Sequence, residues 1–130
     1  SLLPTMSKIS IIKKIQLGTN SFPIENPNSE LSFNFYCGNG EIKHQVFISL
    51  ENSHLLSSLI KNGELSNLDL AQNNVDKFQN LEDQGRVFSY RYQFYNSKEC
   101  NNDYLIIFDI NEYRDYYGIF VYAVLQIEKN

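Results

Sequence analysis

The stretch LSFNFYCGNGEIKHQVFISL, residues 31–50, decides the fold of this chain. Hydrophobic and polar side chains alternate on either side of Gly38-Asn39-Gly40, which is the two-residue period of a strand with one buried face. Asn-Gly between two such runs is a strong hairpin signal, because a type I′ turn needs positive φ at both central residues. We therefore predict an antiparallel hairpin of residues 31–37 and 42–50.

Further strands are predicted on both sides of this hairpin. Residues 8–17 alternate in the same way, and residues 18–29, which contain two prolines and three asparagines, are predicted to be a loop. Period two returns at Arg86, with Phe88, Tyr90, Tyr92 and Phe94 predicted on the core side. Residues 104–110 and 118–127 are almost continuously apolar, which is typical of strands covered on both faces.

One helix is predicted over residues 53–61, with Asn52 or Ser53 as its N-cap and Asn62-Gly63 as its stop. A second apolar set recurs at helical spacing but is interrupted at Asn73-Asn74, so this region is either a short helix or a loop. Its members are Leu68, Ala71, Val75, Phe78 and Leu81.

The order of these elements predicts the fold class. Three strands, one helix, an uncertain segment and three closing strands are joined by connections too short for helical crossovers. We predict an α+β fold, with a mainly antiparallel sheet of about six strands and one helix packed on it. A half-open barrel wrapped around the helix is the alternative.

The composition indicates one globular domain. Hydrophobic residues make up 42% of the 130 residues and charged residues 20%, and no linker-like stretch divides them. We predict a single domain over residues 6–130, with residues 1–5 a cloning remnant before Met6. Because no signal-like or spanning apolar run is present, a cytoplasmic location is expected.

Several classes of chemistry lack their motifs. The glycines are scattered and form no phosphate-binding loop. Cys37 and Cys100 are predicted to be free thiols, the first a small buried hydrophobe and the second exposed in a polar loop. Neither lies at a metal-ligand spacing from His44 or His54, so no metal and no cofactor are predicted. The net charge of −4 argues against nucleic acid and anionic membranes as partners.

Two functions, a small-molecule carrier and a small hydrolase, are kept as alternatives to the protein-binding role that segment 96–116 predicts below. A curved sheet lined by aromatic rings would form an apolar cavity for a small-molecule carrier. Its lining would come from Phe33, Phe35, Phe88, Tyr90, Tyr92 and Phe94. A small hydrolase would need Asp109 or Glu112 to meet His44 in one cleft. Because the sequence contains no motif for such a site, the chain is predicted not to be an enzyme.

The segment 96–116 is the predicted interaction surface. It contains five acids and two bases, a net charge of −3, and tyrosines interleave with the acids. Tyrosine is enriched in binding hot spots, and clustered acids attract a basic partner over a long range. The predicted partner-binding residues of this region are Glu99, Asp103, Asp109, Glu112, Tyr113, Asp115, Tyr116 and Tyr117.

In this general character the chain resembles the small acidic immunity proteins that accompany bacterial polymorphic and contact-dependent toxins. They too are single-domain and motif-poor, with exposed acids and aromatics. The resemblance implies a protein-binding module that neutralises a basic, nuclease-like toxin domain, encoded nearby, by binding and occluding it. It covers the whole chain without a shared motif, so it assigns no individual residue.

Overall fold

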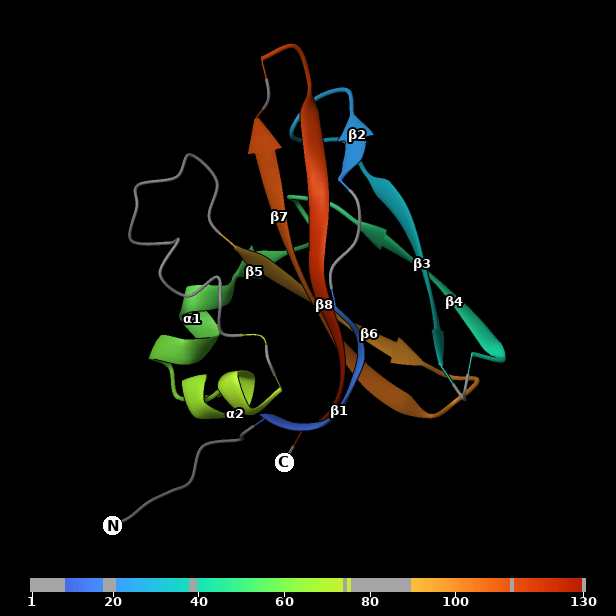
Figure 1. The fold of residues 1–130 in the computed structure, drawn as a ribbon, viewed down its shortest axis with the longest axis vertical. Helices are drawn as coiled ribbons and strands as arrows, with labels where there is room; N and C mark the ends of the chain where they lie inside the picture. The colour runs from blue at the N-terminus through green and yellow to red at the C-terminus, as the bar shows by residue number, and fades with distance from the viewer. Residues whose placement is uncertain are drawn as a thin grey trace.

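A computed structural model describes residues 9–17, 21–37, 40–73, 75, 90–112 and 114–129 (Figure 1). The strands are β1 (Ile9–Leu17), β2 (Phe22–Ile24), β3 (Leu31–Cys37), β4 (Ile42–Ile48), β5 (His54–Leu55), β6 (Arg91–Ser97), β7 (Asn102–Glu112) and β8 (Tyr117–Lys129). The helices are α1 (Leu56–Lys61) and α2 (Asn67–Gln72). Among the described residues, no helix is long and apolar enough to cross a membrane.

The described strands form two antiparallel sheets. A six-stranded main sheet has the order β1-β8-β7-β6-β5, and β2 pairs with the part of β8 that β1 leaves uncovered. The predicted hairpin is confirmed as β3 and β4, which form a separate two-stranded sheet. The α+β class with a mainly antiparallel sheet is therefore confirmed. The main sheet is open and does not close into a barrel, and the hairpin adds a second layer.

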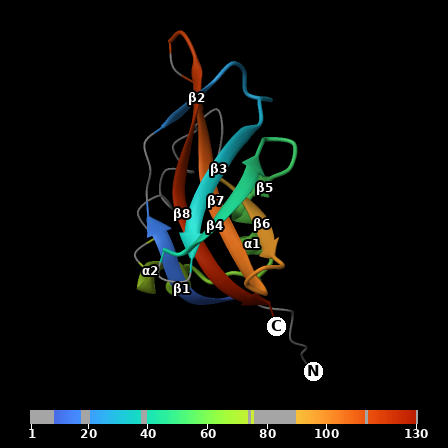
Figure 2. The same ribbon diagram turned by 90° about the vertical axis from the view of Figure 1, so that its right-hand side faces the viewer.

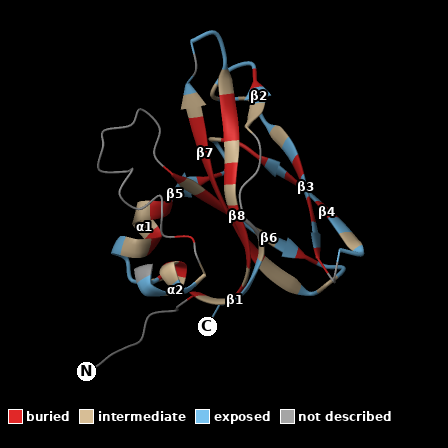
Figure 3. Cartoon of the chain, viewed as in Figure 1, coloured by how far each residue is buried: buried red, intermediate tan, exposed pale blue. Residues whose placement is uncertain are grey.

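This second layer explains the apolar pattern of the closing strands. Figure 2 shows the hairpin lying across one face of the main sheet, and Figure 1 shows the helices on the other side. On β7, Leu105 and Ile107 pack into the core under the helices, whereas Ile106 and Phe108 pack into the core under the hairpin. Figure 3 accordingly shows β7 and β8 buried through the middle of the molecule. Each such side chain stabilises the fold by roughly 1.5–3 kcal/mol.

A β-bulge in β8 changes which side of the sheet its residues face. Ile107 pairs with Ala123 but Phe108 pairs with Val121, so Tyr122 is an extra residue on β8. As a result Val121 lies in the hairpin-side core, whereas Ala123, two residues later, lies in the helix-side core. A bulge of this kind bends and twists the strand locally.

The predicted aromatic face of β6 is only partly correct. Tyr90 and Tyr92 belong to the helix-side core, but Phe94 is 38% exposed and Lys129 Nζ lies 3.8 Å from its ring centroid. The physical reason is that β5 pairs only with Arg91 and Tyr92, so beyond these residues β6 is an open edge. Phe88 lies outside the described residues.

The first helix begins later than predicted. Residues His54–Leu55 form the strand β5, which pairs with β6. The helix α1 begins directly after it at Leu56, without a side-chain cap. Ser53 instead donates to the Leu50 carbonyl (3.0 Å) and accepts from Arg91 Nε (2.6 Å). The predicted end of this helix at Asn62-Gly63 is confirmed, because Gly63 has a left-handed backbone with φ 76°.

Two further predictions are revised by the structure. Of the second apolar set, Leu68 and Ala71 lie in the short helix α2, whose N-cap Ser66 accepts from the backbone N–H groups of Leu68 and Asp69. Phe78 and Leu81 lie outside the described residues. The predicted loop 18–29 contains β2, in which Pro23 pairs with Gly118. Proline is tolerated there because β2 is a short edge strand.

One buried side chain ties the hairpin layer to the main sheet. Gln93 is 7% exposed, accepts from the Ser49 N–H (2.9 Å) and donates to the Phe47 carbonyl (3.0 Å). The sequence pattern predicted Gln93 on the face of β6 away from the core. It is buried because β4 covers that face.

We expect Gln93→Ala to lower the free energy of unfolding by about 1–3 kcal/mol, because the buried Ser49 N–H and the Phe47 carbonyl both lose their hydrogen bond to this side chain. Gln45→Ala is the matched control, since Gln45 is exposed on the same hairpin and bonds only Ser32 Oγ among the contacts described. That control should change stability by less than about 0.5 kcal/mol. Urea unfolding of both variants is the measurement. An equal loss of unfolding free energy in the two variants would contradict the role of Gln93 in attaching the hairpin to the main sheet.

The helix α2 provides a second matched pair. Leu70 is fully buried, whereas Leu68, which the spacing predicted to be apolar core, is 64% exposed. Leu70→Ala should cost about 2–5 kcal/mol of unfolding free energy, because it leaves a cavity in the helix-side core. Leu68→Ala should stay within about 0.5 kcal/mol. A larger loss at Leu68 in urea unfolding would contradict the orientation of this helix.

Candidate functional site

The predicted acidic surface is divided between two ends of the main sheet. Glu99 and Asp103 lie around the β6–β7 turn, whereas Glu112 and Asp115 lie around the β7–β8 turn. The nine residue steps from Asp103 to Glu112 correspond to roughly 30 Å of extended strand. A single compact contact patch made of all the predicted residues is therefore excluded.

One predicted contact residue does not reach the surface. Asp109 is fully buried in the middle of β7, a strand that is covered on both faces. Its place among the partner-binding residues is therefore wrong, because the sequence pattern assigned it to the end of the strand. Tyr113, another predicted contact, lies outside the described residues.

An acidic residue from a distant part of the sequence, Glu25, also lies at the end of the sheet formed by the β7–β8 turn. Ile24 of β2 pairs with Tyr117, which brings the exposed Glu25 to the same end as Tyr116. Figure 3 shows the exposed loop after β2 beside the exposed β7–β8 turn. We call Glu25, Glu112, Asp115 and Tyr116 the acidic tip; Tyr116 is 50% exposed, and Arg114 lies in the same turn.

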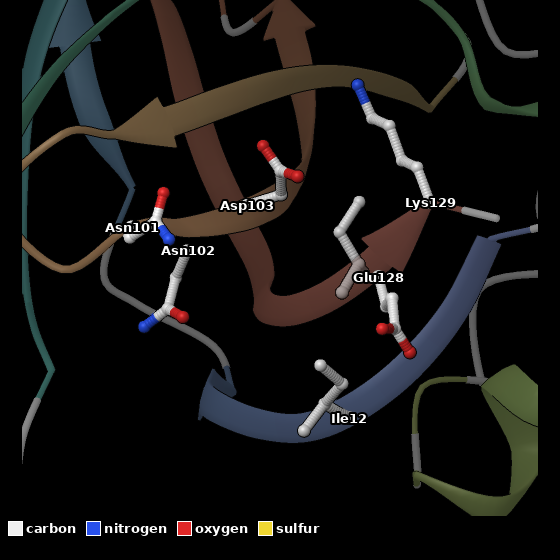
Figure 4. A pocket seen from close by; sticks show the side chains of 7 residues that line it. Ile12, Asn101, Asn102, Asp103, Glu128 and Lys129 are labelled. Carbon is white, nitrogen blue, oxygen red and sulfur yellow. The ribbon is translucent and has the colours of Figure 1, made fainter.

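The β6–β7 end carries a shallow polar hollow of about 250 Å³ (Figure 4). Its lining consists of Ile12, Asn101, Asn102, Asp103, Ile127, Glu128 and Lys129. Asp103 accepts a hydrogen bond from Asn96 Nδ2 at 2.8 Å. In Figure 4 the carboxylates of Asp103 and Glu128 point in different directions, so they do not form a carboxylate pair for acid–base catalysis.

A second candidate site lies between the turn end of the hairpin and the β6–β7 turn. Cys37 Sγ is 2.9 Å from His44 Nε2 and 3.0 Å from Cys100 Sγ, and Cys100 Sγ is 3.4 Å from His44 Nε2. We call these three residues the thiol–imidazole cluster. Cys37 and His44 are buried and Cys100 is partly buried. Cys100 lies in a turn, as predicted, but it is partly buried against Cys37 and not exposed.

Aromatic rings surround this cluster. The ring centroids of Phe35, Tyr104 and Tyr95 lie 5.0, 5.5 and 5.8 Å from that of His44. Burial raises the pKa of the Tyr104 phenol, and the adjacent Cys37 thiol raises it further. The contact with Cys37 raises the pKa of the Cys100 thiol, with burial adding to the effect. A thiol with a raised pKa is a poor nucleophile at neutral pH.

Part of the cluster was accessible from the sequence. In the hairpin register Phe35 pairs with His44 and Cys37 pairs with Ile42, so Cys37 and His44 are diagonal neighbours on its inner face. The alternation and turn of residues 31–50 contain that information. Cys100 is 63 residues from Cys37 and reaches it only because β4 packs beside β6. No local pattern indicates that contact.

The structure separates the residues of both alternative functions. Phe33 and Phe35 lie in the hairpin-side core, whereas Tyr90 and Tyr92 lie in the helix-side core, so they do not line one cavity. Of the residues named for the hydrolase alternative, His44 lies beside Tyr104 at the start of β7, whereas Glu112 lies at the opposite end of that strand, so these two do not meet.

Comparisons of the chain with protein-family models, with curated proteins and with solved structures find no match. The acidic tip and the thiol–imidazole cluster are therefore the two features of the structure that bear on function.

We expect the two thiols to differ in reactivity in the reduced, chelator-treated protein. Iodoacetamide should modify the partly buried Cys100 before the 6% exposed Cys37. Both should react several-fold more slowly than in urea, because burial and the raised pKa of Cys100 limit access and thiolate formation. Peptide mass spectrometry over a time course measures the order, and faster modification of Cys37 would contradict the placement of the cluster.

Proposed function

We propose that this chain is a protein-binding module that engages a basic partner protein through its acidic tip. The observation that carries the proposal is the half-exposed Tyr116 at the end of the β7–β8 hairpin, with Glu112, Asp115 and Glu25 around it. A tyrosine combines a large rigid apolar ring with a hydroxyl that forms hydrogen bonds, which suits the centre of an interface.

The acids around Tyr116 have a separate role in this proposal. Like charges gathered on a protruding tip extend their field into solvent and accelerate the approach of a basic surface. The β6–β7 end is less suited, because Lys98 and Lys129 lie among its acids and Asp103 is engaged by Asn96. The tip therefore replaces the wider predicted set as the proposed contact surface.

The kind of partner follows from the resemblance to toxin immunity proteins together with the charge of the tip. A nuclease domain binds the phosphate backbone through basic residues. An acidic protein that occupies those residues excludes the nucleic acid by competing for the same charges. We propose this immunity-type neutralisation, with a toxin domain encoded next to this chain as the partner.

The test measures association with the product of the neighbouring open reading frame by stopped flow at several salt concentrations. The variant Glu25→Gln/Glu112→Gln/Asp115→Asn should associate roughly 10-fold more slowly at low salt and show a flatter salt dependence, since steering is electrostatic. Tyr116→Ala should mainly accelerate dissociation, by about 30-fold if it is a hot spot worth about 2 kcal/mol.

The matched control changes the same amount of charge at the other end of the sheet. Glu99→Gln/Asp103→Asn/Glu128→Gln should leave the association rate within about twofold, because these residues lie more than a Debye length from the tip. If the control slows association as much as the tip variant, the effect is one of net charge and the proposed surface is wrong. Absence of binding at micromolar concentration rejects the neighbour as the partner.

A further inference from the structure

We propose that the thiol–imidazole cluster is a zinc site, in which Cys37 Sγ, Cys100 Sγ and His44 Nε2 bind one Zn²⁺ ion. This inference is independent of the proposed partner binding, since the cluster lies at the other end of β7 from the acidic tip. Its starting point is the convergence of three metal-binding side chains from three segments: the end of β3, the first half of β4 and the β6–β7 turn.

The distances between the three donor atoms come close to those around a tetrahedral zinc ion, and the donors need to move apart only slightly to reach them. Zinc binds cysteine sulfur at about 2.3 Å and histidine nitrogen at about 2.0–2.1 Å, which places tetrahedral donors about 3.5–3.8 Å apart. The observed separations of 2.9, 3.0 and 3.4 Å are shorter by less than about 1 Å. Cys100 is in a turn and Cys37 ends a strand, so side-chain rotation at these residues can supply the difference.

Hydrogen bonds among the three side chains do not by themselves explain why Cys37, Cys100 and His44 lie together. A thiol is a weak donor and a weak acceptor, so the contacts between two thiols and an imidazole contribute little to stability. The same atoms are strong ligands once the thiols are deprotonated. Phe35 and Tyr104, both fully buried beside His44, cover the imidazole side of the ligand set. Such an apolar shell strengthens the electrostatic attraction between a cation and thiolates.

Charge balance selects zinc among the thiophilic ions. Two thiolates and a neutral imidazole carry a total charge of −2, which Zn²⁺ neutralises. A monovalent ion such as Cu⁺ would leave a net negative charge in a mostly buried site, at a cost in desolvation. Three protein ligands leave the fourth tetrahedral position to water.

The position of the cluster defines what the ion would do. At the far end of the hairpin, Gln93 bonds the backbone around Phe47 and Ser49 and so ties β4 to the main sheet. The cluster lies at the turn end, where Cys37 and His44 of the hairpin meet Cys100 of the β6–β7 turn. Zinc would therefore clamp the second end of the hairpin to the main sheet and stabilise the folded state.

The test uses the untagged full chain, reduced with a phosphine and freed of metal with a chelator. We expect competition against a chromophoric chelator to show one Zn²⁺ per chain, and thermal unfolding to shift upward by several degrees with excess zinc. Co²⁺ in place of zinc should produce a thiolate charge-transfer band and the visible bands of a tetrahedral ion. Cys100→Ser and His44→Gln should each weaken zinc binding at least 100-fold.

The matched control is His54→Gln, because His54 is the exposed second histidine and lies outside the cluster. It should bind zinc as the unmodified chain does. If His44→Gln fails to fold, Cys100→Ser decides alone, since Cys100 is in a turn and only partly buried. The proposal is overturned if the reduced, folded chain binds no zinc, if Cys100→Ser retains full affinity, or if the thiols form a disulfide in air and bind no zinc after reduction.

Discussion

The central constraint on this structure is that β7 and β8 are hydrophobic on both faces. Every residue from Tyr104 to Ile110 is buried, including a carboxylic acid at Asp109. A pair of strands of this kind is stable only when something covers each face of the sheet. The helices cover one face and the β3–β4 hairpin covers the other, so both layers depend on the composition of these two strands.

The hairpin has no strand pairing with the main sheet, because its own ladder joins β3 to β4. Its attachment combines buried apolar side chains with polar contacts at its two ends. Gln93 supplies one end, and the thiol–imidazole cluster marks the other. This arrangement gives a structural reason for burying the polar side chain of Gln93 and the imidazole of His44 beside Cys37.

The acidic tip and the thiol–imidazole cluster occupy opposite ends of the same long hairpin of β7 and β8. The tip lies beyond the region covered on both sides, where side chains such as Tyr116 meet solvent. The cluster lies where the two sheets are held together. The proposed partner binding at one end and the proposed zinc binding at the other are therefore compatible within one small fold.

The sequence by itself determined the local elements: the β3–β4 hairpin, the closing strands, and the helix stop at Gly63. These follow from alternation and turn chemistry, which act within a few residues. Only the tertiary structure decided that Tyr122 is an extra residue in a bulge, that Asp109 is buried, and that Cys100 meets Cys37. The physical reason is that each depends on strand pairing or sheet packing between segments far apart in the chain, and a one-residue shift in β8 reverses which core a side chain enters.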